Sequence, residues 1–303
     1  MKKLTRKLFI SVLVAVFAFV ALGTSTYAWI TLSNTAEVDQ FEATVKAGEA
    51  GIELSEDGNV WGTNLVLSET FKNTYLNKKL DDVTMHYDVD GNMKFYNFKS
   101  ETVNGVVTLA EETTETTAGY VEFDIQIRRT NVAAGTVDSI YVAVDGAKVK
   151  FSTSANDSAG IFEYVKKGEA AVTTDTRASN LFAINALRMS VTGNNGTTEE
   201  EKTVIYEQKV DAKGNTLGYS SEGFAHKYAL NQDYVLPTVT DPITYNDPFQ
   251  AESASDATQI IKLTGATAET IKIRLWIEGW DNECHAQILS QNIQVELGFK
   301  IVG

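Results

Sequence analysis

Acidic and amide side chains alternate at Asp88, Asp90 and Asn92, which is a spacing found in calcium-binding loops. An EF-hand loop also needs a glycine after the third ligand position and a glutamate farther on, and neither is present here. Asp90-Gly91 is at the same time a strong β-hairpin signal when strands flank it. The sequence therefore favours a hairpin tip over an ion site, and we expect no metal or other cofactor.

Cys284 and His285 are the second pair that could do chemistry, as a nucleophile and its base. Neighbouring residues in a strand or loop usually point apart, and no third group that would orient the histidine is implied. The other histidines, His86 and His226, lie in unrelated contexts. No H-E-x-x-H, G-x-S-x-G or P-loop motif occurs. We therefore expect that the protein is not an enzyme.

Aromatic and acidic residues gather near the C-terminal end of the chain. The group consists of Trp276, Trp280, Asp281 and Glu283. Sugar-binding proteins place aromatic rings beside carboxylates on the outer face of a strand, so these residues form a candidate ligand surface. Ordinary packing at the edge of a sheet uses the same residue types, and the sequence leaves both readings open.

The elements that position these residues follow an export signal. Four basic residues open the chain, namely Lys2, Lys3, Arg6 and Lys7. The apolar run 8–22 has the length of a signal peptide and is short for a bilayer span. Thr26 and Ala28 are small residues at the −3 and −1 positions, so we expect cleavage between Ala28 and Trp29. An uncleaved anchor helix is the alternative.

The formal charge of −14 argues against nucleic acid and anionic membrane surfaces as partners. Cleavage removes only basic residues and makes the mature chain more acidic. Such a chain is repelled by nucleic acid and by anionic membranes, so we expect no nucleic acid partner and membrane contact only through the signal helix before cleavage. The single cysteine rules out an intramolecular disulfide.

Strand patterns fill the rest of the chain. Apolar residues alternate with polar ones in segments 41–45, 52–54, 83–98, 121–128, 140–144, 271–277 and 293–301. A period of two residues indicates strands with one buried face, as in antiparallel sheets. The segments 186–191 and 203–207 predict a further hairpin with a short helix before it, although 179–189 also fits helical spacing in part.

The connecting segments are predicted from turn residues and polarity. Residues 55–59 are a turn signal after which Val60-Trp61 resumes the strand. Residues 111–117 are read as a solvated loop, 159–171 as one or two helical turns, 211–257 as loop-rich, and 279–285 as a polar loop.

Short alternating strands with Gly and Asn turns predict a mainly β protein, an antiparallel β-sandwich of jelly-roll type with short helices in its loops and a signal helix in front. The expected divisions are a signal peptide over 1–28, an extended arm over 29–40 and a sandwich domain over 41–303. A final strand that reaches residue 301 is expected to be tied into a sheet.

Two sets of apolar residues follow the cleavage site. The first lies at even-numbered positions (Ile30, Leu32, Ala36 and Val38), and the second at odd-numbered positions (Phe41, Ala43 and Val45). One straight strand cannot face one core with both sets, so a bend or bulge is expected at Asp39-Gln40. The first set, together with Trp29, then forms an arm. The arm either adds to the sheet of a neighbouring copy or folds back onto its own.

The residues at this junction resemble the start of the TasA/camelysin group of exported Gram-positive proteins. The resemblance lies in Ala28-Trp29-Ile30-Thr31, a polar Ser-Asn-Thr segment, and the stretch from Phe41 to Gly48. The segment from Leu275 to Cys284 is similar to a motif of exported proteins in low-GC Gram-positive bacteria and their wall-less relatives. The middle of the chain is unmatched.

This resemblance implies a jelly-roll fibre subunit of a biofilm matrix or cell surface, joined to its neighbours through the N-terminal arm. The proteolysis associated with camelysin is not implied, because no metal-ligand motif is present. We expect a secreted or surface-bound structural protein of a Gram-positive-type bacterium that associates with itself or with other surface proteins. The alternative is a monomeric extracellular module that binds a carbohydrate or another ligand.

Overall fold

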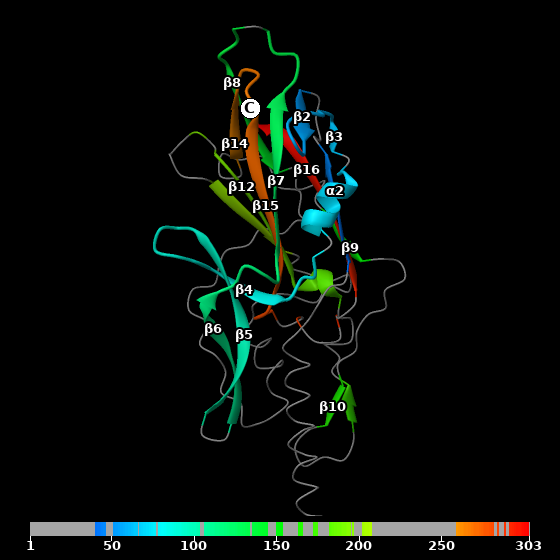
Figure 1. Ribbon diagram of the computed structural model, residues 1–303, viewed down its shortest axis with the longest axis vertical. Helices are drawn as coiled ribbons and strands as arrows, with labels where there is room; N and C mark the ends of the chain where they lie inside the picture. The colour runs from blue at the N-terminus through cyan, green and yellow to red at the C-terminus, as the bar shows by residue number, and fades with distance from the viewer. Residues whose placement is uncertain are drawn as a thin grey trace, which may run out of the picture.

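A computed structural model gives the fold of the chain. It describes residues 40–46, 51–65, 67–76, 78–103, 106–133, 135–144, 150–153, 163–165, 172–174, 182–194, 196, 202–207, 259–281, 284, 288 and 291–302. The protein is mainly β, with antiparallel and mixed sheets, as the alternating patterns predict (Figure 1). The predicted signal peptide, the arm residues 29–38 and the segment 211–257 lie outside the described residues.

A six-stranded sheet is built around the last strand and is called the β16 sheet below. Its main order is β14 (Gln259–Thr264), β8 (Ser139–Val144), β16 (Asn292–Val302), β1 (Gln40–Lys46) and β3 (Asn64–Leu65), and β9 (Lys150–Thr153) also pairs with β16. Strand β1 runs parallel to β16, whereas the other pairs are antiparallel. The last strand is thus tied into a sheet, as predicted.

An eight-stranded sheet is built around β15 and is called the β15 sheet. Its main order is β13 (Lys202–Glu207), β12 (Leu187–Gly193), β15 (Glu269–Glu278), β4 (Asp82–Tyr87), β5 (Met93–Val103) and β6 (Val106–Glu115), while β7 (Val121–Arg129) pairs with β15 and with β2 (Ile52–Ser55). β15 is antiparallel to β12 and β7, and its last two residues run parallel to β4. This junction brings the β4–β5–β6 strands to the end of β15.

Helices are short in the described part of the chain. α2 (Glu69–Phe71) is capped by Ser68, whose hydroxyl accepts a hydrogen bond from the backbone N–H of Phe71 at 3.1 Å. A π-helical turn, η1 (Lys72–Leu76), follows it, and a 3₁₀ turn, η3 (Ala183–Asn185), precedes β12. None of the described helices is long and apolar enough to cross a bilayer.

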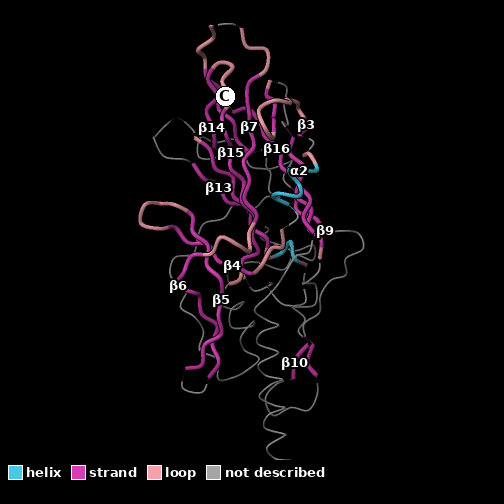
Figure 2. Tube along the Cα trace, in the orientation of Figure 1, coloured by secondary structure: helices cyan, strands magenta, loops and turns pink. Residues whose placement is uncertain are grey.

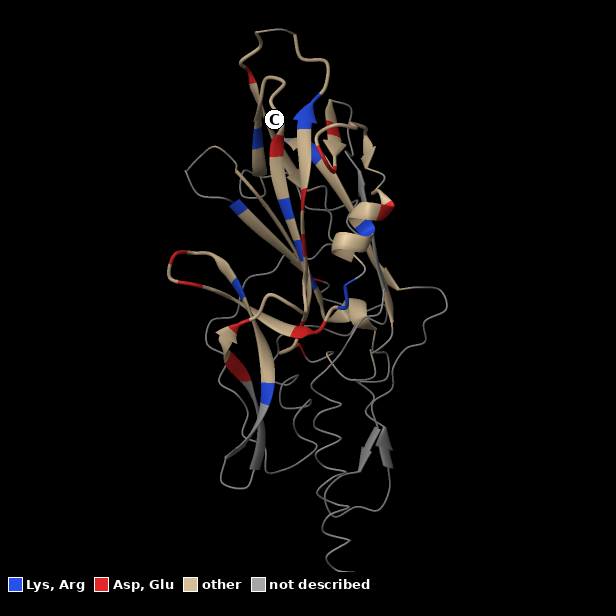
Figure 3. Ribbon diagram, viewed as in Figure 1, with Lys and Arg blue, Asp and Glu red and all other residues tan. Residues whose placement is uncertain are grey.

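One hydrophobic cluster receives side chains from both large sheets. β7 and β15 contribute Ile125 and Ile273, and β8 and β16 contribute Val142 and Leu297. Along β7 the buried and more exposed residues alternate as predicted, and Lys, Arg, Asp and Glu occupy several of the remaining positions of β7 and β15 (Figure 3). A second cluster lies on the other face of the β15 sheet and consists of Val83, Met85, Phe95, Ile205 and Trp276.

Both predicted hairpins are confirmed. β4 and β5 pair from Val83 opposite Asn97 to Tyr87 opposite Met93, with the Asp90-Gly91 tip between them. β12 and β13 pair antiparallel, and the short helix expected before β12 is η3. In each hairpin the period-two pattern and the turn residues agree, which fixes the register locally.

Three local predictions are wrong. Glu111 to Glu115 belong to β6, since Glu111 pairs with Phe98 and Glu115 with Tyr96 of β5, and this pairing overrides their polarity. Residues 163–165 form strand β10 (Glu163–Val165) against β11 (Val172–Thr174), although helical turns were expected there. Residues 60–61 do not resume a strand, since the Asp57 carboxylate accepts hydrogen bonds from the N–H groups of residues 59 and 60 and prolongs the turn; the chain next bridges β2 at Gly62.

Candidate functional site

The structure places the predicted ligand-surface residues inside the protein. Trp276 is 0% and Trp280 is 4% exposed, and Asp281 is fully buried. The rings do not form an outer surface, because the face of β15 that carries Trp276 is covered by the second hydrophobic cluster. The predicted exposed surface is therefore corrected to a buried cluster, and the predicted polar loop after β15 is buried over residues 279–281. Glu283 lies outside the described residues.

Glu278 anchors the turn that follows β15. Its fully buried carboxylate accepts a hydrogen bond from the indole Nε1 of Trp276 at 3.1 Å and one from the backbone N–H of Trp280 at 3.2 Å. The backbone N–H of Asp281 donates to the Glu278 carbonyl at 3.0 Å. A buried carboxylate requires such donors, and here they fix the turn directly at the strand end.

Glu111 of β6 joins this turn to β4. One of its carboxylate oxygens accepts a hydrogen bond from the Trp280 indole N–H, and the other lies 2.8 Å from Nε2 of His86. Three elements that are distant in sequence thus meet at one carboxylate. We call His86, Glu111, Trp276, Glu278 and Trp280 the β15-end cluster.

Protonation of this cluster follows from its contacts. The hydrogen bond to Glu111 is the main cause that raises the pKa of His86 above its usual value of 6.5, and burial acts against it. Burial acts to raise the pKa of Glu111, but the hydrogen bonds from His86 and Trp280 outweigh it, so the pKa lies below the usual 4.5. Both shifts favour an ion pair between an imidazolium and a carboxylate.

A second polar group, the Arg188 cluster, consists of Arg188, Glu207 and Asp281. The register places Arg188 of β12 opposite Glu207 of β13 on one side and opposite Trp276 of β15 on the other. Its fully buried guanidinium lies 2.8 Å from a Glu207 oxygen and also donates to the Asp281 carboxylate. The arginine therefore joins β12 and β13 to the turn after β15.

The second candidate pair, Cys284 and His285, comes directly after the turn that carries Asp281. Cys284 is buried, and its backbone N–H donates to the Asp281 carbonyl at 3.1 Å, while His285 lies outside the described residues. A buried thiol of this kind is not in reach of a substrate in solution. The Cys284–His285 hypothesis therefore gains no support.

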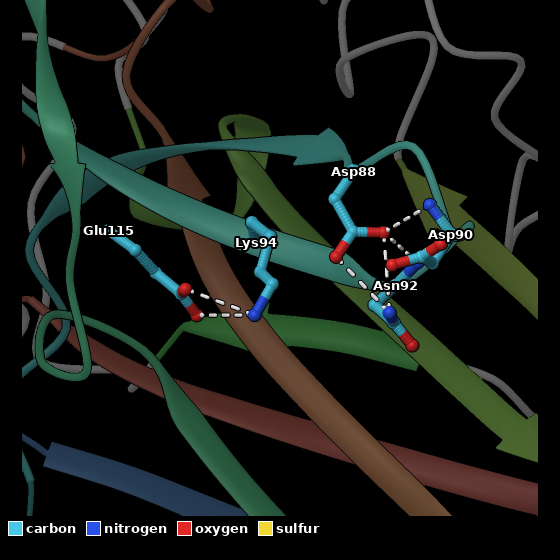
Figure 4. A network of polar contacts seen from close by, with 5 residues as sticks. All are labelled: Asp88, Asp90, Asn92, Lys94 and Glu115. Atoms are coloured by element: carbon cyan, nitrogen blue, oxygen red, sulfur yellow. Dashed lines mark hydrogen bonds and ion pairs between the residues drawn. The ribbon is translucent and has the colours of Figure 1, made fainter.

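Asp88 closes the β4–β5 hairpin (Figure 4). Its Oδ1 atom accepts hydrogen bonds from the backbone N–H groups of Asp90 at 2.9 Å and Asn92 at 2.8 Å, and Gly91 has a φ of 82°. The neighbouring Lys94 pairs with Glu115 of β6 at 3.0 Å. The Asp88 carboxylate is thus used as the acceptor of an Asx turn. Among the described residues, no three His, Cys, Asp or Glu side chains are grouped as metal ligands.

No protein-family model matches the chain, and neither a characterised protein nor a solved structure is significantly similar to it. The site therefore has to be interpreted from its own contacts.

Sequence reasoning found the two tryptophans and Asp281 but missed their partners. Glu111 lies 169 residues from Trp280 in sequence and 25 from His86, and Arg188 lies 93 residues from Asp281. Only the alternation pattern carried a signal, since it placed His86 and Arg188 on strands. Without strand order, no pattern shows that these side chains meet.

The two clusters are arranged to hold strands together. Each carboxylate of the β15-end cluster accepts hydrogen bonds from indole, imidazole or backbone donors. The arrangement supplies buried hydrogen bonds between β4, β6, β12, β13 and the end of β15. These contacts stabilise the packing of the strands against one another.

Proposed function

We propose that the protein is an exported structural protein of a Gram-positive-type cell surface or extracellular matrix. In this proposal the signal helix 1–28 is removed, the two large sheets form a jelly-roll sandwich, and residues 29–38 of one copy add a strand to the sheet of the next. The shared hydrophobic cluster of the two sheets supports the sandwich. The basic and apolar start of the sequence supports export.

The observation that carries the proposal is the position of β1. All seven residues of β1 pair in parallel with β16, from Gln40 opposite Asn292 to Lys46 opposite Gly298. The strand thus begins where the parity of the apolar residues changes. Phe41, Ala43 and Val45 lie in the protein's own sheet, while the arm with Ile30 and Leu32 precedes it. This division supports an arm with a role of its own.

The alternative of a ligand-binding module draws no support from the residues first assigned to it. Trp276 and Trp280 are buried, and their indole N–H groups are bound to Glu278 and Glu111. A stacked sugar needs an open ring face. The structural proposal is therefore favoured.

Deleting residues 29–38 from the mature chain tests the proposal. We expect a folded monomer by circular dichroism and size-exclusion chromatography, and no filaments in negative-stain micrographs, whereas the intact mature chain forms them. The pair Ile30→Ser and Leu32→Ser should act like the deletion, and the matched pair Thr31→Ala and Ser33→Ala, on the opposite parity, should still assemble. Unfolding on deletion, or an intact chain that stays monomeric at all concentrations, would refute an assembly arm.

A further inference from the structure

Strands β5 and β6 run on together beyond β4. β5 has 11 residues, but its pairing with β4 covers only Met93 to Asn97. From Phe98 opposite Glu111 to Val103 opposite Val106, β5 pairs with β6, beyond the end of its pairing with β4. We call residues 98–103 and 106–111 the ribbon, and Figure 2 shows β5 and β6 continuing past β4. A two-stranded ribbon is marginally stable in water, so its attachment decides how well it is ordered.

Phe98 and Glu111 attach the base of the ribbon to the turn after β15 and to β4. The ring of Phe98 packs edge-on against the Trp280 ring, with centroids 4.7 Å apart. Glu111, directly opposite Phe98, accepts the Trp280 indole N–H and lies 2.8 Å from Nε2 of His86. The His86–Glu111 contact is the part of this attachment that changes with protonation, because neutral imidazole makes a weaker hydrogen bond than imidazolium does.

We propose that His86 and Glu111 form a proton-controlled latch, which holds the ribbon on the turn after β15 while His86 is protonated and loosens it when the proton is lost. The latch is half-exposed, with 42% of the His86 side chain and 30% of the Glu111 side chain accessible. Protons therefore reach it without unfolding. The latch stands independently of the role proposed above.

The charges around His86 come from every strand beside it. Glu111 approaches from β6 and Glu278 from the end of β15, and both favour the imidazolium. Lys94 of β5 lies opposite His86 in the register, but it is bound to Glu115 at 3.0 Å, which offsets its charge. The Tyr96 ring lies 5.7 Å away. The charges close to His86 thus stabilise its protonated form.

The direction of the pH effect follows from the two pKa shifts. The pKa of His86 is raised, so its contribution is complete below the unfolded value of 6.5 and is lost as pH rises through the folded pKa. The pKa of Glu111 is lowered, so its contribution is complete above 4.5 and is lost as pH falls through its folded pKa. The latch is therefore tightest between these two unfolded values. It loosens as pH rises through the folded pKa of His86, and also as pH falls through the folded pKa of Glu111.

Hydrogen exchange of the intact chain tests the latch. Protection of the ribbon amides, corrected for intrinsic exchange, should fall about two- to fivefold between about pH 5.5 and about pH 8.5, which is the range for a partly exposed ion pair. Amides of β12 and β13 serve as the internal reference. His86→Gln should remove the pH dependence, and Lys94→Gln, the matched control on β5, should retain it.

A second readout keeps the test decisive if His86→Gln folds poorly. In the unmodified protein the Trp280 indole N–H resonance should titrate together with the His86 ring, since both are bound to Glu111. Equal ribbon protection at both pH values would overturn the proposal. So would a pH dependence that survives in a folded His86→Gln variant.

Discussion

The ring of Phe98 lies so close to the α-carbon of Gly279 that a β-carbon at position 279 would overlap the ring's Cε2 atom. Gly279 is buried, and its backbone N–H donates to the Val83 carbonyl at 2.9 Å, which joins the end of β15 to β4. The absence of a side chain at 279 thus allows the aromatic ring of β5 to pack directly on the turn.

Gly279→Ala is expected to lower the free energy of unfolding by about 1–3 kcal/mol, because the methyl group has no room beside the Phe98 ring. Chemical denaturation measures the change. Gly62→Ala is the matched control: its nearest contact would be the Asn64 carbonyl oxygen at 3.3 Å, and a smaller loss than at position 279 is expected. In the Phe98→Leu background the penalty at 279 should shrink. An unchanged penalty there would assign it to the backbone instead.

Asp88→Ala is expected to destabilise the β4–β5 hairpin, because the Oδ1 acceptor for the N–H groups of Asp90 and Asn92 is lost. Asp90→Ala is the control, since Asp90 contributes only its backbone N–H to this turn. The hydrogen bond from the Asn92 backbone is the main cause that lowers the pKa of Asp88, so this stabilisation is present above pH 3.8 and is lost as pH falls through the folded pKa. Thermal melts of the unmodified protein and of Asp88→Ala, above pH 3.8 and below the folded pKa of Asp88, measure this difference in stability.

Calcium removal should leave the melting temperature unchanged, because the Asp88 carboxylate serves as the acceptor of a turn. The comparison is one protein sample melted with and without EDTA. A large decrease in EDTA would mean that an ion is bound in the native state and stabilises it by mass action.

Processing is expected to leave Trp29 as the first residue of the secreted protein, because Thr26 and Ala28 fit the small-residue preference of signal peptidase. N-terminal sequencing of protein from the culture medium decides this. Recovery of chains that retain Met1 in the membrane fraction would show that the apolar run serves as an anchor, and the arm would then be a stalk.

Local pattern was enough to predict the strands whose buried residues alternate along their own length. In β7 every second residue from Val121 to Ile127 is buried, so a period of two is visible without any partner. The β4–β5 hairpin was predictable for the same reason, since its turn residues and its alternation lie in one stretch.

Pairing between strands that are distant in sequence decides the features that could not be predicted. Glu111 and Glu115 are polar enough for a loop, and only their pairing with Phe98 and Tyr96 makes them part of a strand. Trp276 was placed outside because it alternates with the core residues of β15. It is buried because Val83 and Ile205, from two other strands, build a second cluster on that face.

Arg188→Met should be the most destabilising of the substitutions considered. The guanidinium is completely buried, lies 2.8 Å from Glu207 and also binds Asp281, so its removal leaves two buried carboxylates facing each other without the cation between them. Breaking a buried ion pair in this way costs about 3–5 kcal/mol.

Lys72→Met is the matched control, since Lys72 pairs with Glu69 at 2.8 Å in an exposed pair, where about 0–1 kcal/mol is expected. Equal losses in the two variants would show that the cluster contributes packing rather than charge pairing.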